Sequence, residues 1–269
     1  LFGAVGWRVG VAPALALTAC IALLSDAPLG GVLPIQATGF AALLLAVAGF
    51  AACGAGRSGA AALVAAAASG AALNFFDFLY TPAAFAMLNA WVWLAASRRD
   101  ARPRGASGGL WVFAASLAGY GAFWALKWAA AFALDPHGDE VFIFGAGEFA
   151  RWGPATGGTA PFEAIAAVTA QTFDAGWKLA AAAWLAALTA GLAVLQRAPE
   201  HGPVRNLALL LLPLAPAALV IELMAAHTLA HTSFTFRIVP MALGLIAASL
   251  LRSRYTAPDA RNAAISAAP

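Results

Sequence analysis

Long apolar runs separated by short polar connections make up most of this 269-residue chain. The runs are continuous and rich in Ala and Leu, without the alternation of apolar and polar residues that membrane β-strands show. A helix needs about 20 mostly apolar residues to cross a bilayer. We therefore expect an all-α, polytopic bundle of about eight transmembrane helices, at residues 9–25, 35–56, 59–76, 82–97, 108–134, 176–196, 206–225 and 238–251.

The connections refine this organisation. Asp77 and Pro82 interrupt an apolar stretch, so 59–76 and 82–97 also fit one broken or re-entrant hairpin. We expect the long outer connection 135–175 to contain an amphipathic interfacial helix at 161–174, with Phe162, Ile165, Val168 and Phe173 on one side. The transmembrane domain would span 1–255, and 256–269 would be a disordered cytoplasmic tail. Because an apolar run almost directly follows Leu1, we also expect a longer protein with further N-terminal helices.

Composition supports a lipid environment. Hydrophobic residues make up 62% of the chain and charged residues 10%, with a mean hydropathy of +0.82, whereas soluble domains are about 45–50% apolar and about 25% charged. The net charge of +3 does not indicate nucleic-acid binding, because the Arg residues stand in short spacers and no nucleic-acid motif is present. Cys20 and Cys53 lie inside apolar runs without disulfide or zinc spacing.

Basic and acidic residues alternate between successive connections, which predicts the orientation. One set of connections is basic, with Arg8, Arg57, Arg98, Arg99, Arg102, Arg104, Arg197, Arg205, Arg252, Arg254 and Arg261. The opposite set is acidic, with Asp26, Asp77, Asp135, Asp139, Glu140, Glu148, Glu163 and Asp174. We expect a multi-pass protein of the bacterial inner membrane, with both ends in the cytoplasm and the acidic face outside.

The first chemical constellation is Asn74-Phe75-Phe76-Asp77-Phe78-Leu79-Tyr80-Thr81-Pro82. An ionisable residue at the membrane boundary is a functional hypothesis by default, and Asp77 is a candidate catalytic acid or base. Two structural alternatives stay open. Asp77 or Thr81 caps the next helix, with Pro82 at its first position, or the aromatic residues form an ordinary interfacial belt.

The second constellation lies on the fifth predicted helix, where the spacing of Tyr120, Trp124 and Lys127 places them on one face. Lys127 stands about two turns inside the outer end of the apolar run. It either snorkels to the interface or faces a polar cavity, where it pairs with an anion such as a phosphate group or Asp77. We treat all three residues as candidate substrate- or phosphate-binding residues.

The third constellation follows Glu222 and runs from His227-Thr228-Leu229-Ala230-His231 to Phe236-Arg237. His227 and His231 are four residues apart, so a helix places them on one face, as a pair of metal ligands requires. No third ligand is adjacent, and buried histidines are often only hydrogen-bonded, so a divalent metal stays an open prediction. His227 and His231 are candidate catalytic residues, and Thr228 and Arg237 are candidate substrate contacts.

The predicted topology brings all three constellations to the outer face. There, Asp77 and the two histidines would share general acid/base work. Lys127 and Arg237 would hold a phosphate or a lipid phosphate head group, Arg as a bidentate fork and Lys as a point charge. The chain has no Walker A loop, no GxGxxG after a strand, no HExxH and no GxSxG, which argues against ATP-driven transport and ordinary hydrolase chemistry.

The same three constellations resemble blocks of the form FFDFLTxP, GYxxxWxxKW and NHSxxHxxFTYR, in that order along the chain. Together they resemble a widespread family of bacterial polytopic membrane proteins of uncharacterised function. The chain departs from this pattern at Ala226, where Asn is expected, and at Phe236, where Tyr is expected. Both departures remove a polar group from the third block.

The layout is similar to that of GT-C glycosyltransferases, which take a sugar from a polyprenyl-phosphate donor at the outer face. The resemblance implies a membrane enzyme whose partners are membrane lipid and a polyprenyl-phosphate-linked sugar. Its usual catalytic acid lies in the first outer loop, where this chain has Asp26. The alternative is a transporter or flippase for a lipid-linked or small anionic substrate, and a third possibility is a non-catalytic membrane scaffold.

Overall fold

The computed structural model describes residues 1–25, 34–57, 59–76, 82–96, 105–134, 162–195, 203–230 and 232–254, which form helices and turns without any strand. The helices are α1 (Phe2–Val9), α2 (Val11–Leu24), α3 (Pro34–Cys53), α4 (Ala60–Phe76), α5 (Pro82–Ala96), α6 (Ala106–Leu134), α8 (Glu163–Thr172), α9 (Gly176–Leu195), α10 (Pro203–Leu211), α11 (Leu214–Leu223), α12 (Ala225–Ala230), α13 (Thr232–Thr235) and α14 (Ile238–Arg254). The predicted all-α class is therefore confirmed for these residues.

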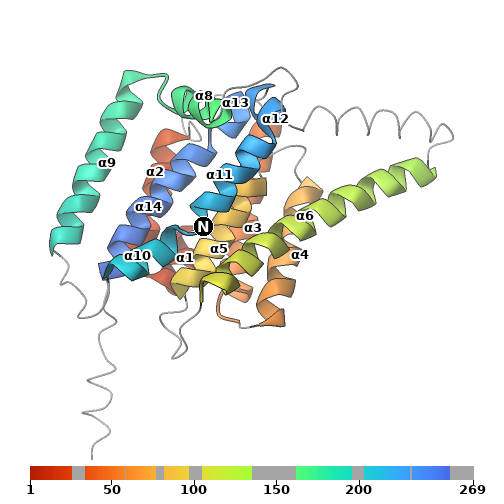
Figure 1. Ribbon diagram of the computed structural model, residues 1–269, viewed down its shortest axis with the longest axis horizontal. Coiled ribbons are helices and arrows are strands. Elements are labelled where there is room, and N and C mark those ends of the chain that lie inside the picture. The colour runs from red at the N-terminus through yellow and green to blue at the C-terminus, as the bar shows by residue number, and fades with distance from the viewer. Residues whose placement is uncertain are drawn as a thin grey trace, which may run out of the picture.

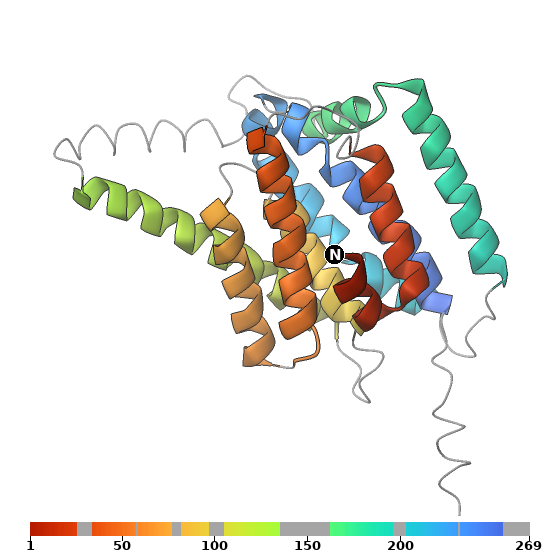
Figure 2. The ribbon, with the colours of Figure 1, turned by 180° about the vertical axis from the view of Figure 1, so that it is seen from behind.

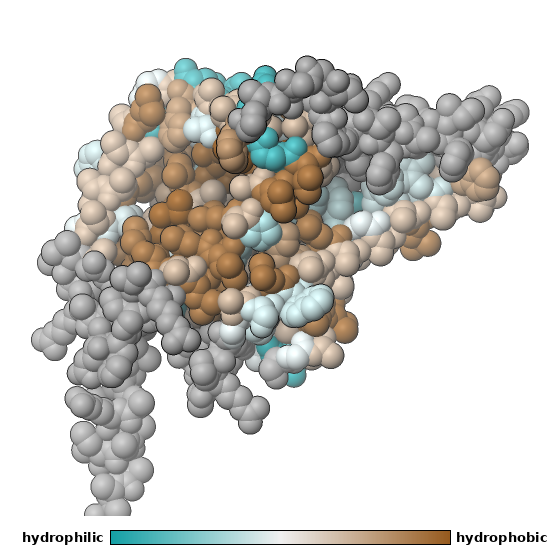
Figure 3. Space-filling model, in the orientation of Figure 1, coloured by the Kyte–Doolittle hydropathy of each residue, from teal (hydrophilic) through white to brown (hydrophobic). Residues whose placement is uncertain are grey.

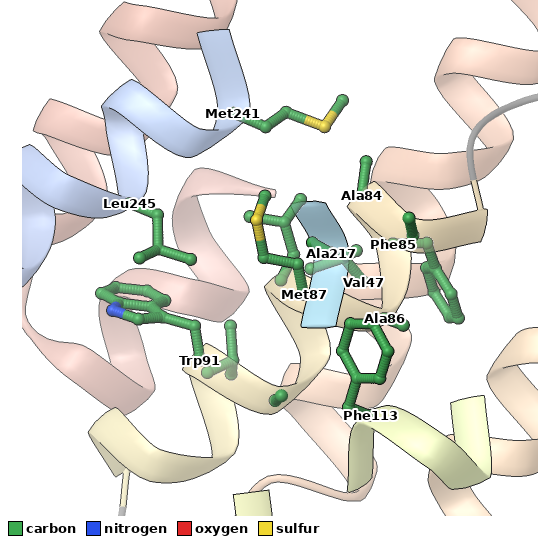
Figure 4. Packing of buried hydrophobic residues seen from close by; sticks show 14 of the residues in the cluster. Val47, Ala84, Phe85, Ala86, Met87, Trp91, Phe113, Ala217, Met241 and Leu245 are labelled. Atoms are coloured by element: carbon green, nitrogen blue, oxygen red, sulfur yellow. The ribbon is translucent and has the colours of Figure 1, made fainter. Parts of the chain in front are cut away.

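Helix α5 occupies the centre of the bundle (Figure 1), and every residue from Ala83 to Ala96 is buried. Trp91 packs beside Leu245 of α14 (Figure 4). Its Nε1 donates a hydrogen bond of 2.8 Å to the Ser249 hydroxyl, also on α14. A helix that is apolar on all sides has to be surrounded by other helices or by lipid, and here helices surround it.

Helices α4 and α6 pack most closely at two glycines, and we call this contact the α4–α6 seam. A Cβ added to Gly70 would overlap the main-chain carbonyl of Ser116, and one added to Gly119 would overlap the carbonyl of Ala67. Small residues are common where membrane helices approach this closely. At these two positions no side chain fits.

Large apolar side chains cover much of the outer surface (Figure 3). They include Leu110, Trp111, Leu126, Phe132 and Leu134 on α6, and Trp177, Leu179, Trp184, Leu188 and Leu192 on α9. Exposed apolar area on this scale is unusual for a soluble monomer. By length and composition, α6 and the Gly176–Ala193 part of α9 are apolar and long enough to cross a membrane.

The remaining predicted spans correspond to shorter apolar helical stretches of 10–17 residues: Val11–Leu24, Ala41–Cys53, Ala60–Phe75, Pro82–Ala96, Leu207–Leu223 and Ile238–Arg252. Two interruptions of helices were not predicted. Gly10, with φ of 103°, separates α1 from α2, because this backbone conformation is open mainly to glycine. The predicted helix 206–225 is interrupted between α10 and α11 at Leu212 and Pro213, where proline cannot continue the hydrogen-bond ladder.

Two arginines satisfy the last carbonyls of helices distant in the sequence. Arg8 of α1 donates to the carbonyls of Ala51 and Ala52 near the end of α3, at 2.9 and 2.7 Å. Arg252 of α14 donates from Nε and Nη2 to the carbonyl of Ala95 in α5, at 3.3 and 3.1 Å. The last turn of a helix has unsatisfied carbonyls and a partial negative charge. These arginines therefore join helices to one another at the end of the bundle opposite α8 (Figure 2).

Candidate functional site

The predicted site residues divide into three groups. Asp77 and His231 lie outside the described residues, and His227 belongs to α12 with its side chain also outside them. Tyr120, Trp124 and Lys127 lie on α6, beside the end of α4. Thr228 and Arg237 lie close to α8.

The Lys127 ammonium group reaches the C-terminal end of α4. Its Nζ donates to the main-chain carbonyl of Asn74 and lies 3.5 Å from that of Phe75. It also lies 5.6 Å from the centroid of the Phe123 ring, within the range of a cation–π contact. Lys127 thus caps α4 from a neighbouring helix, a task that the sequence analysis did not consider. Phosphate binding by Lys127 stays a prediction.

Two aromatic pairs lie at the end of α4 and along the part of α6 that carries Lys127. Phe75 and Phe123 meet edge to face with centroids 5.9 Å apart, and Trp124 and Trp128 lie 5.9 Å apart in a tilted arrangement. Phe75 is 59% exposed, whereas Phe123 and Trp124 are half-buried. At the C-terminal end of α4, the α4–α6 seam is therefore lined by aromatic rings that are partly exposed.

Asn74 lies within this aromatic region. It follows Ala67 and Gly70 by seven and four residues, so it shares the face of α4 that packs on α6. Its side chain is buried, and neither Nδ2 nor Oδ1 has a hydrogen-bond partner. Asn74 begins the first constellation, but nothing in the sequence indicates a role for it.

Arg237, from the third group, lies beside Phe236 in a cluster that we call the α8 corner: Thr172, Asp174, Lys178, Phe236 and Arg237. Arg237 is buried, its Nε donates to the carbonyl of Ser25 at 3.3 Å, and its Cζ lies 5.6 Å from the Phe236 ring centroid. Ser25 is the C-cap of α2. Arg237 therefore holds the end of another helix, as Lys127 does.

Lys178 is the functional candidate that sequence reasoning missed. It is only 2% exposed, forms a 2.8 Å ion pair with Asp174, and lies 5.4 Å from the Phe236 ring centroid. The Thr172 hydroxyl donates to the Phe236 carbonyl at 3.2 Å. Two buried cations thus share one aromatic ring. The i, i+4 spacing of Asp174 and Lys178 at the start of an apolar run was the signal that could have revealed the pair.

Glu222 connects α11 to α8. Its Oε1 accepts a hydrogen bond of 3.0 Å from the main-chain N–H of Ile165, in the first turn of α8. A carboxylate at a helix N-terminus satisfies an otherwise unpaired donor and meets the positive end of the helix dipole. Glu222 therefore fixes α8 onto α11.

Two threonines join the short helices α11, α12 and α13 beside α8. The Thr228 hydroxyl donates to the carbonyl of Ile221 at 3.4 Å, and the Thr235 hydroxyl donates to the carbonyl of Thr228 at 3.3 Å. Of the α8 face expected to be apolar, Val168 is buried, but Phe162 is 68% exposed. Phe162 is exposed because it precedes the helix, with a left-handed φ of 66°.

The residues around Lys127 and those of the α8 corner do not converge on one site. Figures 1 and 2 agree that the second half of α6 leaves the bundle on the side away from α8 and α9. Lys127 and Arg237 consequently serve different helix ends. Within the described part of the chain, no three His, Cys, Asp or Glu side chains lie together in a way that could hold a metal ion. A metal at His227 and His231 stays a prediction.

No protein-family model matches this chain, and no curated protein or solved structure matches it significantly.

Proposed function

We propose that the chain is a multi-pass protein of the bacterial inner membrane, with α8 at the extracytoplasmic face. The apolar surfaces of α6 and α9 support a lipid environment. Arg8 and Arg252 lie at the end opposite α8, as the excess of basic residues on the cytoplasmic side requires. The proposal includes about eight membrane-spanning helices, with both ends of the chain in the cytoplasm.

For the activity, we propose a GT-C-like glycosyltransferase that takes a sugar from a polyprenyl-phosphate donor at this face. The observation that carries the proposal is the α8 corner, where buried Lys178 and Arg237 lie on the ring of Phe236. The ammonium group lies 5.4 Å and the guanidinium 5.6 Å from the same ring centroid, and a phosphate has enough acceptor oxygens to bind both kinds of cation. The corner belongs to the same region as α12, which carries His227.

Sugar transfer breaks the bond between the anomeric carbon and the phosphate oxygen, and it forms a bond to an acceptor hydroxyl. The leaving phosphate retains the electron pair, so cations next to it stabilise the developing charge. The acceptor hydroxyl loses its proton to a base. Asp77, His227 and His231 are the candidates for this base, and Lys178 and Arg237 are the proposed phosphate contacts.

The test uses the purified chain in lipid vesicles with a radiolabelled polyprenyl-phosphate hexose as donor. We expect label to leave the donor and appear in a water-soluble or acceptor-linked product. Lys178→Met and Arg237→Gln should each lower this rate at least tenfold. Arg8→Gln is the matched control, because it removes a cation that caps α3 at the opposite end of the bundle, and it should retain most of the rate. A donor that remains intact with every acceptor supplied would overturn the proposal.

A transporter is the second candidate, because the chain from Pro203 to Thr235 consists of the short helices α10, α11, α12 and α13. Interrupted helices are common at the substrate sites of transporters. In the same vesicles, a transporter would move the labelled donor to the opposite leaflet with the sugar–phosphate bond intact. Chemical analysis of the lipid after incubation separates the two functions.

A further inference from the structure

We propose that Trp7 and Arg57 bind an anionic phospholipid at the end of the bundle opposite α8. The site lies where α1 meets the turn between α3 and α4, and the proposed orientation places it in the cytoplasmic leaflet (Figure 2). It goes beyond the proposed activity, because it lies at the other face of the membrane and shares no residue with the α8 corner.

The main chain of Arg57 is held on both sides, although its side chain is exposed. Its N–H donates to the carbonyl of Gly54 at 2.9 Å, and its carbonyl accepts a hydrogen bond of 3.3 Å from Nε1 of Trp93 on the central helix α5. Within the residues that the structure describes, no group forms a hydrogen bond or an ion pair with the Arg57 guanidinium. A group with five N–H donors is therefore held in place and available to a ligand.

Arg8 brings Trp7 to the same turn. Its Cζ lies 4.3 Å from the centroid of the Trp7 ring. A Cβ added to Gly56, the residue before Arg57, would lie 2.5 Å from Nη1 of Arg8. The Arg8 guanidinium therefore lies between the Trp7 ring and the turn. Because it already caps α3, Arg8 joins the two lipid contacts as a structural residue.

The distribution of charge indicates an anionic ligand. The acidic side chains in the described part of the chain all lie on α8 or in contact with its neighbours: Glu163, Asp174 and Glu222. The opposite end has Arg8, Arg57 and Arg252 instead. A phosphate offers oxygens that match the planar donors of a guanidinium, and basic residues next to a membrane attract anionic lipids. The head group of such a lipid is therefore a suitable partner for Arg57.

Exposed apolar side chains on α1 and at the start of α2 favour a lipid over a water-soluble phosphate. Val5 and Val9 of α1 are buried against the bundle, whereas Phe2 and Val11 are exposed and Trp7 is 61% exposed. Tryptophan is enriched at the level of lipid head groups, because its ring is apolar and its N–H is polar. A phospholipid offers a phosphate to the cation and an apolar chain to these side chains, and a free phosphate offers only the first.

The test uses native mass spectrometry of the full chain in detergent, mixed with equal amounts of dioctanoyl phosphatidylglycerol and dioctanoyl phosphatidylcholine. We expect the wild type to retain the anionic lipid over the zwitterionic lipid by about fivefold, the effect of one basic residue at a membrane surface. Arg57→Gln should bring this ratio close to one, and Arg57→Lys should keep most of it. Trp7→Ala should weaken binding of both lipids and leave their ratio unchanged. The Arg57 variants alter an exposed side chain, so their thermal midpoints should equal that of the wild type.

Arg261→Gln is the matched control, because it removes the same charge from the C-terminal segment, and it should keep the lipid preference. Equal losses in Arg57→Gln and Arg261→Gln would indicate a general charge effect and overturn the site. Equal retention of the two lipids by the wild type would overturn it as well. Inorganic phosphate at the concentration of the lipid should displace nothing, and displacement would show a site for free phosphate instead. None of these results bears on sugar transfer, which is tested with the Lys178 and Arg237 variants.

Discussion

Gly70 on α4 faces the main-chain carbonyl of Ser116 on α6 so closely that a methyl group cannot lie between them. Gly119 meets the carbonyl of Ala67 in the same way. Because both obstacles are backbone atoms, neither can turn aside as a flexible side chain would. The spacing of the seam, and with it the position of Asn74 against α6, depends on these two glycines.

Gly70→Ala and Gly119→Ala should each destabilise the protein by about 1–3 kcal/mol, because overpacking displaces the backbone. Gly49→Ala and Gly121→Ala are the controls, since a Cβ at either position meets nothing within 4 Å. Alanine favours a helix over glycine by about 1 kcal/mol, so the controls should be neutral or more stable. Thermal unfolding in detergent measures the four variants, and equal behaviour of both pairs would contradict the close contact.

Arg252→Met should destabilise the protein by about 1–3 kcal/mol, because it leaves the carbonyl of Ala95 without its buried donors. Arg252→Lys should lose less, since an ammonium group keeps one donor but not the planar pair. Urea unfolding followed by tryptophan fluorescence would report the change, because Trp91 and Trp93 lie on the same helix as Ala95. Arg252→Met as stable as the wild type would rule out the cap.

Glu222→Ala should loosen the first turn of α8, because the N–H of Ile165 loses its acceptor. Loss of a helix N-cap costs about 0.5–2 kcal/mol. Glu222→Gln keeps an acceptor oxygen and should behave nearly as the wild type. Hydrogen–deuterium exchange at residues 163–168 is the measurement. Faster exchange in Glu222→Gln than in Glu222→Ala would contradict the proposed contact.

Lys178→Met should leave the stability of the fold within about 1 kcal/mol of the wild type, because the Asp174 carboxylate that stays behind is 47% exposed and is hydrated by water. Asp174→Asn should destabilise by about 1 kcal/mol, since the carboxylate is 47% exposed and solvent screens its attraction. A double-mutant cycle by thermal unfolding gives the coupling. Loss of sugar transfer in a fully stable Lys178→Met variant would assign the lysine to function rather than to packing.

The helical segments were predictable because each depends on a property of one continuous stretch of sequence. An apolar run of sufficient length specifies a helix wherever its neighbours lie, and the runs containing α5 and α6 show this. Lys127 and Arg237 could not be interpreted in this way. Their hydrogen bonds reach Asn74 and Ser25, which are 53 and 212 residues away. The sequence shows where a cationic residue stands on its own helix, but it does not show which distant helix end that residue contacts.

The unpaired state of Asn74 was also beyond sequence analysis, because it depends on what α6 presents to α4. The helical spacing predicts a shared face for Tyr120, Trp124 and Lys127, but it did not single out Phe123, whose ring meets Phe75 and lies 5.6 Å from Lys127 Nζ. Whether any of them offers a hydrogen bond to Asn74 is a matter of ångströms across the seam. Similarly, Lys178 was recognisable as the partner of Asp174, but its contact with Phe236 required the fold.

The contact between Arg252 and Ala95 has a consequence for the order of assembly during synthesis. Helix α5 is the most buried helix, yet the donor for its last turn comes from a residue made 157 positions later. Until α14 has left the ribosome, the carbonyl of Ala95 lacks these donors and has to be hydrated or bound by another group. Helix α14, which is synthesised long after α5, therefore closes the centre of the protein. In a chain stalled before Arg252, the innermost helix α5 would be formed, but the carbonyl of Ala95 in its last turn would lack the hydrogen bonds from Arg252.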